Sequence, residues 1–121
     1  MQRTLRLKIS VTPEARAILL LTARQHTACY NAITTEGWET ETTNGVTLHH
    51  ATYFQLRERF PDQPSQLVCT ARRQAAESLR AVRTRLKQGR KASKPSSSLQ
   101  AVRYDQRTYT IVLTEGWATL A

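Results

Sequence analysis

Acidic residues are scarce in this sequence, and their scarcity limits the chemistry that the chain can perform. Nine of its 121 residues are Asp or Glu, against 18 Lys and Arg. No two acids form the paired-carboxylate or Asp-x-Asp arrangement that acid–base or metal-dependent catalysis uses. No Ser lies in a nucleophile elbow, and Ser, His and Cys follow no known catalytic order. We therefore predict that the chain is not an enzyme and holds no cofactor.

Cysteine is also scarce, which argues against a disulfide framework. Cys29 and Cys69 are the two cysteines, and they share no Cys-x-x-Cys or Cys/His ligand spacing. We expect both to be small buried hydrophobic residues in a reducing compartment. His26 is expected to be a packed core histidine, and the neighbours His49 and His50 diverge on a helix, so they cannot jointly bind a metal. The sequence predicts no metal site.

Long hydrophobic runs are absent as well. The longest, Ala17 to Leu21, is far shorter than the roughly 20 residues that cross a membrane. Met1 to Ser10 alternates in polarity and contains no apolar secretory signal. With 40% hydrophobic residues and a mean hydropathy of −0.50, the composition is typical of one soluble globular domain. We therefore predict a cytoplasmic protein without a membrane partner.

Positive charge is what the chain has in excess, and it is gathered in one stretch. Between Gln66 and Lys94 there are nine basic residues and one acid, Glu77, a net +8 of the chain's +9. Ser65 to Lys94 reads as one long helical stretch, with Ser65 as N-cap and Gly89 as its natural stop. Its apolar residues recur at spacings of three and four, which predicts one buried stripe made of Val68, Ala71, Ala75, Leu79, Val82 and Leu86.

The basic residues of this stretch are expected to face a polyanion. At 100° per residue, several of them fall in an arc beside the apolar stripe. A solvated helix face usually mixes charges of both signs, because like charges on one face destabilise a helix. The signs do not mix here, which favours nucleic acid as the partner. The predicted nucleic-acid-binding residues of the stretch are Arg72, Arg73, Arg80, Arg83, Lys87, Arg90, Lys91 and Lys94.

Two further helices are predicted before the basic one. Thr12-Pro13-Glu14 combines an N-cap hydroxyl, a proline at the first helical position and an acid in the first turn, so a helix should run from Pro13 to about Thr35. Glu36 to Val46 is predicted to be a loop. Thr47 is expected to cap a second helix that ends near Phe60. The expected buried side of the first helix includes Ile18, Leu19, Ala23, His26, Tyr30 and Ile33, widened by Leu20 and Leu21.

Strand patterns lie at the two ends of the chain. Thr4 to Ser10 alternates, which predicts a half-buried strand with a basic outer face, and its two charges alone fit a protected edge strand. Gln100 to Tyr104 and Arg107 to Leu113 are predicted to form a hairpin around Asp105-Gln106. Gly116 to Leu120 is a candidate for a further strand.

The order of these elements predicts an α+β fold. One strand and one hairpin cannot each form a stable sheet, so we expect them to pair in a small antiparallel β-sheet or partial β-barrel. A three-helix bundle would be inserted into it. The chain would be a single module, 1–121, whose β part is 1–11 and 99–121 and whose inserted helical part is 12–94. Arg90 to Ser98 is expected to be a mobile linker, and the open sheet edge to favour self-association.

Several short motifs resemble the N-terminal region of the TnpB (OrfB) family. Leu5 to Ile9, followed by Thr12-Pro13-Glu14, resembles the short basic strand and capped helix that begin those proteins. Tyr30-Asn31-Ala32 resembles the Tyr-Asn-x-Ala/Leu signature that ends their first helix. A later helix with Gln74 and Ala75 fits the same scheme, and Val102 to Tyr109 resembles the hairpin where the chain re-enters the barrel.

The resemblance implies a function. TnpB proteins are RNA-guided DNA nucleases of transposable elements and are similar to type V CRISPR effectors. In them this region is a wedge-type β-barrel with a helical recognition insert, which binds guide RNA and RNA–DNA heteroduplex. Their catalytic acids and zinc ribbon lie in a downstream RuvC-like domain that this sequence lacks, so the resemblance implies an excised domain, a truncated product or a stand-alone relative. It also implies a second binding surface on the strands, made of Arg6, Lys8, Arg103 and Tyr104, with Tyr104 available to stack on a base.

Two other functions remain open at the level of sequence. One is a sequence-specific DNA-binding protein with a helix-turn-helix-like bundle, although the third helix is long for a recognition helix. The other is an interaction module whose basic helix meets an acidic protein. The sequence does not distinguish between RNA, DNA and a hybrid as the nucleic-acid partner.

Overall fold

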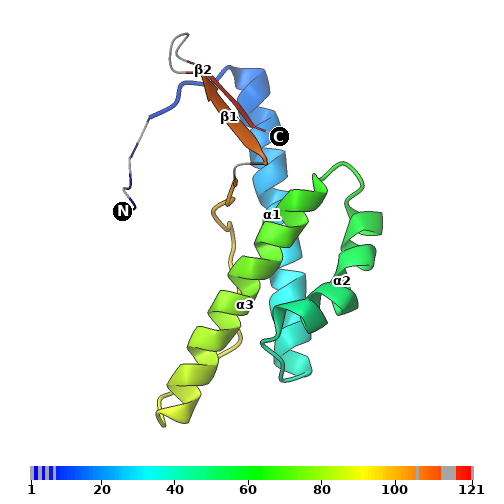
Figure 1. The fold of residues 1–121 in the computed structure, drawn as a ribbon, viewed down its shortest axis with the longest axis vertical. Coiled ribbons are helices and arrows are strands. Elements are labelled where there is room, and N and C mark those ends of the chain that lie inside the picture. Colours follow the sequence, from blue (N-terminus) through cyan, green and yellow to red (C-terminus); the bar gives the residue numbers. More distant parts are fainter. Residues whose placement is uncertain are drawn as a thin grey trace.

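A computed structural model describes residues 2, 4, 6, 8–105, 107–112 and 117–120. Three helices form its body and pack against one another (Figure 1). None of the described helices is long and apolar enough to cross a membrane. The elements in chain order are α1 (Pro13–Glu39), α2 (Gly45–Arg59), α3 (Ser65–Lys87), β1 (Tyr109–Val112) and β2 (Trp117–Leu120).

The start of α1 confirms the prediction, and its end lies further on than predicted. The Thr12 hydroxyl accepts a hydrogen bond from the Ala15 N–H at 3.1 Å, and Pro13 is the first helical residue. The helix continues past Thr35 to Glu39. Gly37, which was expected to lie in a loop, is a buried residue of this helix.

The start and end of α2 and α3 follow from local chemistry. Asn44, not Thr47, caps α2: its Oδ1 accepts from the N–H groups of Val46 and Thr47 at 2.9 and 3.1 Å. Ser65 was expected to cap α3 but is its first residue, and no side chain caps this helix. Gly89, with φ of +74°, ends α3 as predicted.

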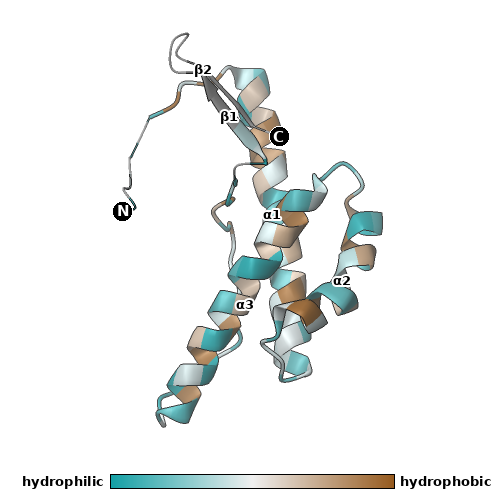
Figure 2. Ribbon diagram, in the orientation of Figure 1, coloured by the Kyte–Doolittle hydropathy of each residue, from teal (hydrophilic) through white to brown (hydrophobic). Residues whose placement is uncertain are grey.

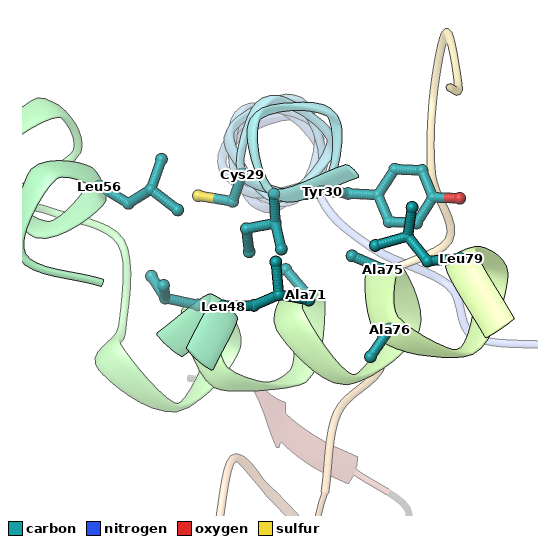
Figure 3. Packing of buried hydrophobic residues seen from close by; sticks show 10 residues of the cluster. Cys29, Tyr30, Leu48, Leu56, Ala71, Ala75, Ala76 and Leu79 are labelled. Atoms are coloured by element: carbon teal, nitrogen blue, oxygen red, sulfur yellow. The ribbon is translucent and has the colours of Figure 1, made fainter. Parts of the chain in front are cut away.

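The core lies where the three helices meet. Figure 3 shows Cys29 of α1 pointing toward Leu56 of α2, and Tyr30 of α1 lying beside Ala75 and Leu79 of α3. Burying one large aliphatic side chain contributes about 1.5–3 kcal/mol. The N-terminal part of the predicted α3 stripe is confirmed as buried, namely Val68, Ala71, Ala75 and Leu79.

Two parts of the predicted core are exposed instead. Leu86 on α3 is 48% exposed, and Ile18 and Leu21 on α1 are 65% and 55% exposed. The buried residues of α1 all lie between His26 and Gly37, the part of the helix that α2 and α3 cover. Periodicity identified the apolar side of each helix, but the lengths of the partner helices decide how much of that side is buried.

The predicted sheet or partial barrel is wrong. β1 and β2 form a two-stranded antiparallel hairpin in which Tyr109 lies opposite Leu120 and Val112 opposite Trp117. No residue of either strand has its Cα within 8 Å of a residue of α1, α2 or α3. The described residues at 4, 6 and 8–10 are not in a strand, and neither are residues 100–104. Within the described residues the fold is therefore a three-helix bundle followed by a small hairpin.

Other residues of the expected strands lie outside the described ranges, among them Leu5, Leu7 and Leu113. β1 pairs with Trp117–Leu120, which lies within the stretch that was predicted as a further strand. The predicted partner of β1 was instead the segment before Asp105-Gln106. Self-association through an open sheet edge stays a prediction.

Residues 94–105, the return segment, take the place of the expected linker and first hairpin strand. They run back beside α3 toward the start of the bundle (Figure 1). On the α1 side, Asn31 donates to the Ser97 carbonyl at 2.9 Å and accepts from its N–H at 3.0 Å, while the Thr27 hydroxyl accepts from the Gln100 N–H at 2.8 Å. These bonds attach an extended chain to α1 without a neighbouring strand, and the mobility expected for residues 90–98 stays a prediction.

Bonds from α3 hold the same segment on its other side. The Gln74 amide donates to the Ala101 carbonyl at 3.0 Å, and Gln66 donates to Asp105 at 2.6 Å. Alternation of polar and apolar residues at 100–104 had suggested a strand. The structure has no strand there, and side chains of α1 and α3 bond the Gln100 N–H and the Ala101 carbonyl instead.

The cysteines agree with the sequence prediction in most respects. Cys29 is fully buried, and burial raises the pKa of its thiol to about 11. Cys69 is half-buried, and neither cysteine forms a disulfide. Cys29 is therefore an inert core residue.

His26 is a buried core histidine, as predicted. It is fully buried, and its Nε2 lies 2.6 Å from the Oε1 atom of Gln74. Because that amide oxygen can only accept, Nε2 carries the proton of a neutral ring. Burial lowers the pKa of His26 below its usual value of 6.5, although the bond to Gln74 opposes the shift.

Acid should therefore destabilise the fold as pH falls below 6.5, because His26 is buried in its neutral form. Below pH 6.5 the unfolded chain binds a proton at His26 that the native state does not, so the free energy of unfolding should fall as pH falls from 6.5 toward the lower native pKa, by up to about 1.4 kcal/mol per pH unit. Urea unfolding between pH 7.5 and 5.5 would measure it. His49, whose pKa is also lowered, adds a smaller slope of the same sign.

Two variants separate these contributions. His26→Gln should remove most of the slope, and His49→Gln a minor part. An unchanged slope in His26→Gln would contradict the assignment.

Candidate nucleic-acid interface

The charged helix α3 has a buried half and an exposed half. Leu79 is its last buried residue, and from Arg80 to Lys87 every residue except the half-buried Val82 is exposed. Figure 1 shows this outer half leaving α1 and α2, and Figure 2 shows mostly hydrophilic turns with hydrophobic positions between them. The outer half therefore presents basic side chains to solvent.

The structure gathers three of the predicted arginines on one side of α3. Arg72, Arg80 and Arg83 line a cavity of about 660 Å³, together with residues 41–46 of the α1–α2 loop and the start of α2. Gly45 leaves room for Arg72, since a Cβ there would lie 2.9 Å from Nη1. The Nε atom of Arg72 is buried and has no hydrogen-bond partner within the described part of the chain.

Other predicted residues are placed differently. Arg73 is half-exposed and lies 4.0 Å from Asp105, on the side of the return segment. Lys87, Arg90 and Lys91 are exposed at the outer end of α3 and just after it. Lys94 donates to the Thr35 hydroxyl at 3.2 Å.

The acid of α3 is paired with an arginine from outside the helix. Arg103 donates from both terminal nitrogens to Glu77, at 2.9 and 3.1 Å. This contact lowers the pKa of Glu77 and raises that of Arg103. The hydrogen bonds of Glu77 therefore go to the return segment, although the charge of Arg80 on α3 also contributes to the lowered pKa of Glu77.

The second surface that the resemblance implied is dispersed. Arg103 is engaged by Glu77, and Tyr104 is half-buried, with its pKa raised by burial. Arg6 and Lys8 are exposed in the N-terminal segment and line neither of the cavities described here. These four residues do not form one strand surface, because residues 6, 8, 103 and 104 are not in a sheet.

A second cavity, which we call the Trp38 cleft, was missed by sequence reasoning. It has a volume of about 420 Å³ and lies between the end of α1 and the outer half of α3. Its apolar lining is Gly37, Trp38, Leu79, Val82 and Leu86. Trp38 was predicted to lie in a loop. The sequence signal for the cleft is the Gly37-Trp38 pair, in which a residue without a side chain stands beside a large aromatic one.

The neighbouring histidines do not form a metal site. His49 stacks on Tyr53, with ring centroids 4.6 Å apart, and His50 is exposed. Among the described residues no group of three or more His, Cys, Asp or Glu is placed to hold a metal ion.

Comparison with known proteins adds no relative. No family model, no curated protein and no solved structure matches this chain. The resemblance to TnpB proteins therefore stays a prediction.

Proposed function

We propose that this chain is a nucleic-acid-binding module that holds the sugar-phosphate backbone with α3 and carries out no catalysis itself. The observation that supports the proposal best is the charge of α3. Its outer half exposes Arg80, Arg83 and Lys87, and the acid of the helix, Glu77, is engaged by Arg103. Exposed cations on one helix face repel one another, and a polyanion removes that repulsion.

A helix-turn-helix reading has less support. Recognition helices contact base edges with residues near their N-terminus. The N-terminal half of α3 is buried against α1 and α2, including Leu67, Val68 and Ala71, and its exposed half is C-terminal. Phosphate contact by the outer half needs no base code, so binding should depend little on sequence.

The resemblance to TnpB proteins implies a narrower proposal. It would make the chain the N-terminal part of an RNA-guided DNA endonuclease, in contact with guide RNA or heteroduplex. The barrel that this family uses was the part of the expectation that proved wrong, so our proposal rests on the charge of α3. RNA, DNA and an RNA–DNA hybrid should each be offered as ligands.

The test compares two variants with the same charge change. Arg80, Arg83 and Lys87 are replaced by Gln in one, and the exposed Arg16, Arg24 and Arg59 in the other, so both lose three positive charges. The first should lose about two to three units of log–log salt slope, which corresponds to a weakening of about 100-fold at 0.1 M salt. The second should stay near the parent. Fluorescence anisotropy with labelled strands over a salt series measures both quantities.

Folding should be retained in both variants, because Gln preserves helix propensity and these side chains are exposed. Equal weakening of nucleic-acid affinity in the two variants would show that binding depends on the net charge of the protein and not on the position of the charges on α3. Parental affinity and slope in the α3 variant would overturn the proposal. An acidic protein that competes while nucleic acid does not would favour the interaction-module reading.

A further inference from the structure

The Trp38 cleft and the arginine-lined cavity are adjacent. Both are lined by Glu41, Thr42, Thr43 and Arg83. The first adds an apolar wall that includes Trp38, a residue that is 38% exposed, and the second adds Arg72 and Arg80. An apolar surface thus lies directly beside a cationic one. Their volumes are about 420 and 660 Å³, and both are open to solvent.

This pair of surfaces matches the two parts of a nucleotide. A nucleobase has apolar faces that stack on aromatic side chains, and its phosphates are bound by arginine. The apolar wall is not closed by other described residues, since Trp38 and Leu86 remain 38% and 48% exposed. Arg72, Arg80 and Arg83 line the neighbouring cavity and supply the guanidinium groups that a phosphate would contact.

One acid belongs to the same place and limits where an anion fits. Glu41 lines both cavities, at the end of α1, with φ of 54°. In the second cavity this one acid is outnumbered by Arg72, Arg80 and Arg83, so an anion is expected there. In the Trp38 cleft the charges of Glu41 and Arg83 balance and the rest of the lining is uncharged, so the cleft suits an uncharged group.

We propose that this composite site takes one unpaired nucleotide of a single-stranded nucleic acid. The base enters the Trp38 cleft and stacks on the indole, and the adjoining phosphates lie against Arg72 and Arg80. The inference rests on the proposed function and narrows its ligand to single strands, of RNA or DNA. In a duplex the bases are stacked and paired, so none is available to the cleft unless it is flipped out at an energetic cost.

The test uses strands that share a phosphate backbone and differ in their bases. The probes are a labelled oligothymidylate and an oligouridylate of about 10 nucleotides, an abasic oligomer of the same length, and a duplex. The parent should bind the two base-containing strands about tenfold more tightly than the abasic one, because one base is stacked. Trp38→Leu keeps an apolar side chain but removes the aromatic face, and it should abolish that preference while leaving duplex and abasic affinity unchanged.

Three controls accompany this variant. Trp38→Phe should restore most of the preference. Phe54→Leu, which removes an aromatic residue 72% exposed on α2, should leave every affinity unchanged. In a Trp117→Phe background, the remaining indole of Trp38 should be quenched by the base-containing strands and not by the abasic oligomer.

The outcomes separate this inference from the proposed function. Equal binding of abasic and base-containing strands by the parent, with binding still lost in the Arg80/Arg83/Lys87 variant, would overturn the nucleotide site and leave the α3 interface standing. A loss of duplex affinity in Trp38→Leu as large as the loss for single strands would also overturn it. Absence of binding to every probe would overturn both proposals. A difference in affinity between the oligothymidylate and the oligouridylate would show whether the site prefers DNA or RNA.

Discussion

Replacing Gln74 by methionine should lower the free energy of unfolding by about 2–4 kcal/mol. The Gln74 side chain is 7% exposed and joins two parts of the molecule, accepting from His26 at 2.6 Å and donating to the Ala101 carbonyl at 3.0 Å. Methionine fills similar volume but serves neither group. A buried N–H without a partner costs about 1–3 kcal/mol, and the lost bond to Ala101 adds about 1 kcal/mol. Urea unfolding followed by circular dichroism measures the change.

A double variant tests whether the loss is due to the hydrogen bonds. His26→Leu combined with Gln74→Met makes both buried partners apolar, and its stability should lie well above the sum of the single losses, because no polar group stays unpaired. Hydrogen exchange at the Gln100 amide, which donates to Thr27, should rise in Gln74→Met if this glutamine holds the return segment. Additive losses together with unchanged exchange would show that Gln74 contributes only packing.

Gly37→Ala should destabilise the protein although alanine is the better helix former. A Cβ at this position would lie 2.3 Å from Cδ1 of Leu79 and 3.0 Å from the Thr42 carbonyl oxygen. Overpacking of this kind costs about 1–3 kcal/mol, against a gain of about 1 kcal/mol in helix propensity. We expect a net loss of up to about 2 kcal/mol, measured by the same unfolding experiment.

The sign of this effect should reverse when Leu79 is shortened. Leu79→Ala alone should cost about 2–5 kcal/mol, because it leaves a cavity in the core. In that background the new methyl group at position 37 enters the vacated space, so Gly37→Ala should raise stability by about 1 kcal/mol. A loss of the same size in both backgrounds would mean that the contact with the Thr42 carbonyl oxygen, at 3.0 Å, and not the contact with Leu79, makes glycine necessary.

Gly37 also connects stability to the proposed site. It lines the Trp38 cleft, and Leu79 forms part of the same wall. The glycine lets the end of α1 approach α3 closely. Because the approach brings Trp38 and the outer half of α3 to one cleft, the same close contact that builds the core also builds the site.

The three helices, the start of α1, the end of α3 and the charge of α3 were determined by the sequence itself. Thr12 and Pro13 begin α1, Gly89 ends α3, and the spacing from Val68 to Leu79 marks the buried side. Each of these depends on neighbours within one or two helical turns, which is the range over which capping and periodicity act. The nine basic residues between Gln66 and Lys94 can likewise be counted from the sequence alone.

Tertiary structure alone decided what lies beside these helices. Gln100 to Tyr104 alternates like a strand, but Thr27 and Gln74, far away in sequence, offer it side-chain partners, so the expected sheet does not form. Trp38 lines a cleft adjacent to the cavity of Arg72 and Arg80, at the place where Gly37 allows α1 to approach Leu79. The periodicity of a sequence does not predict such contacts. They depend on how the helices pack against one another and not on the order of residues within one helix.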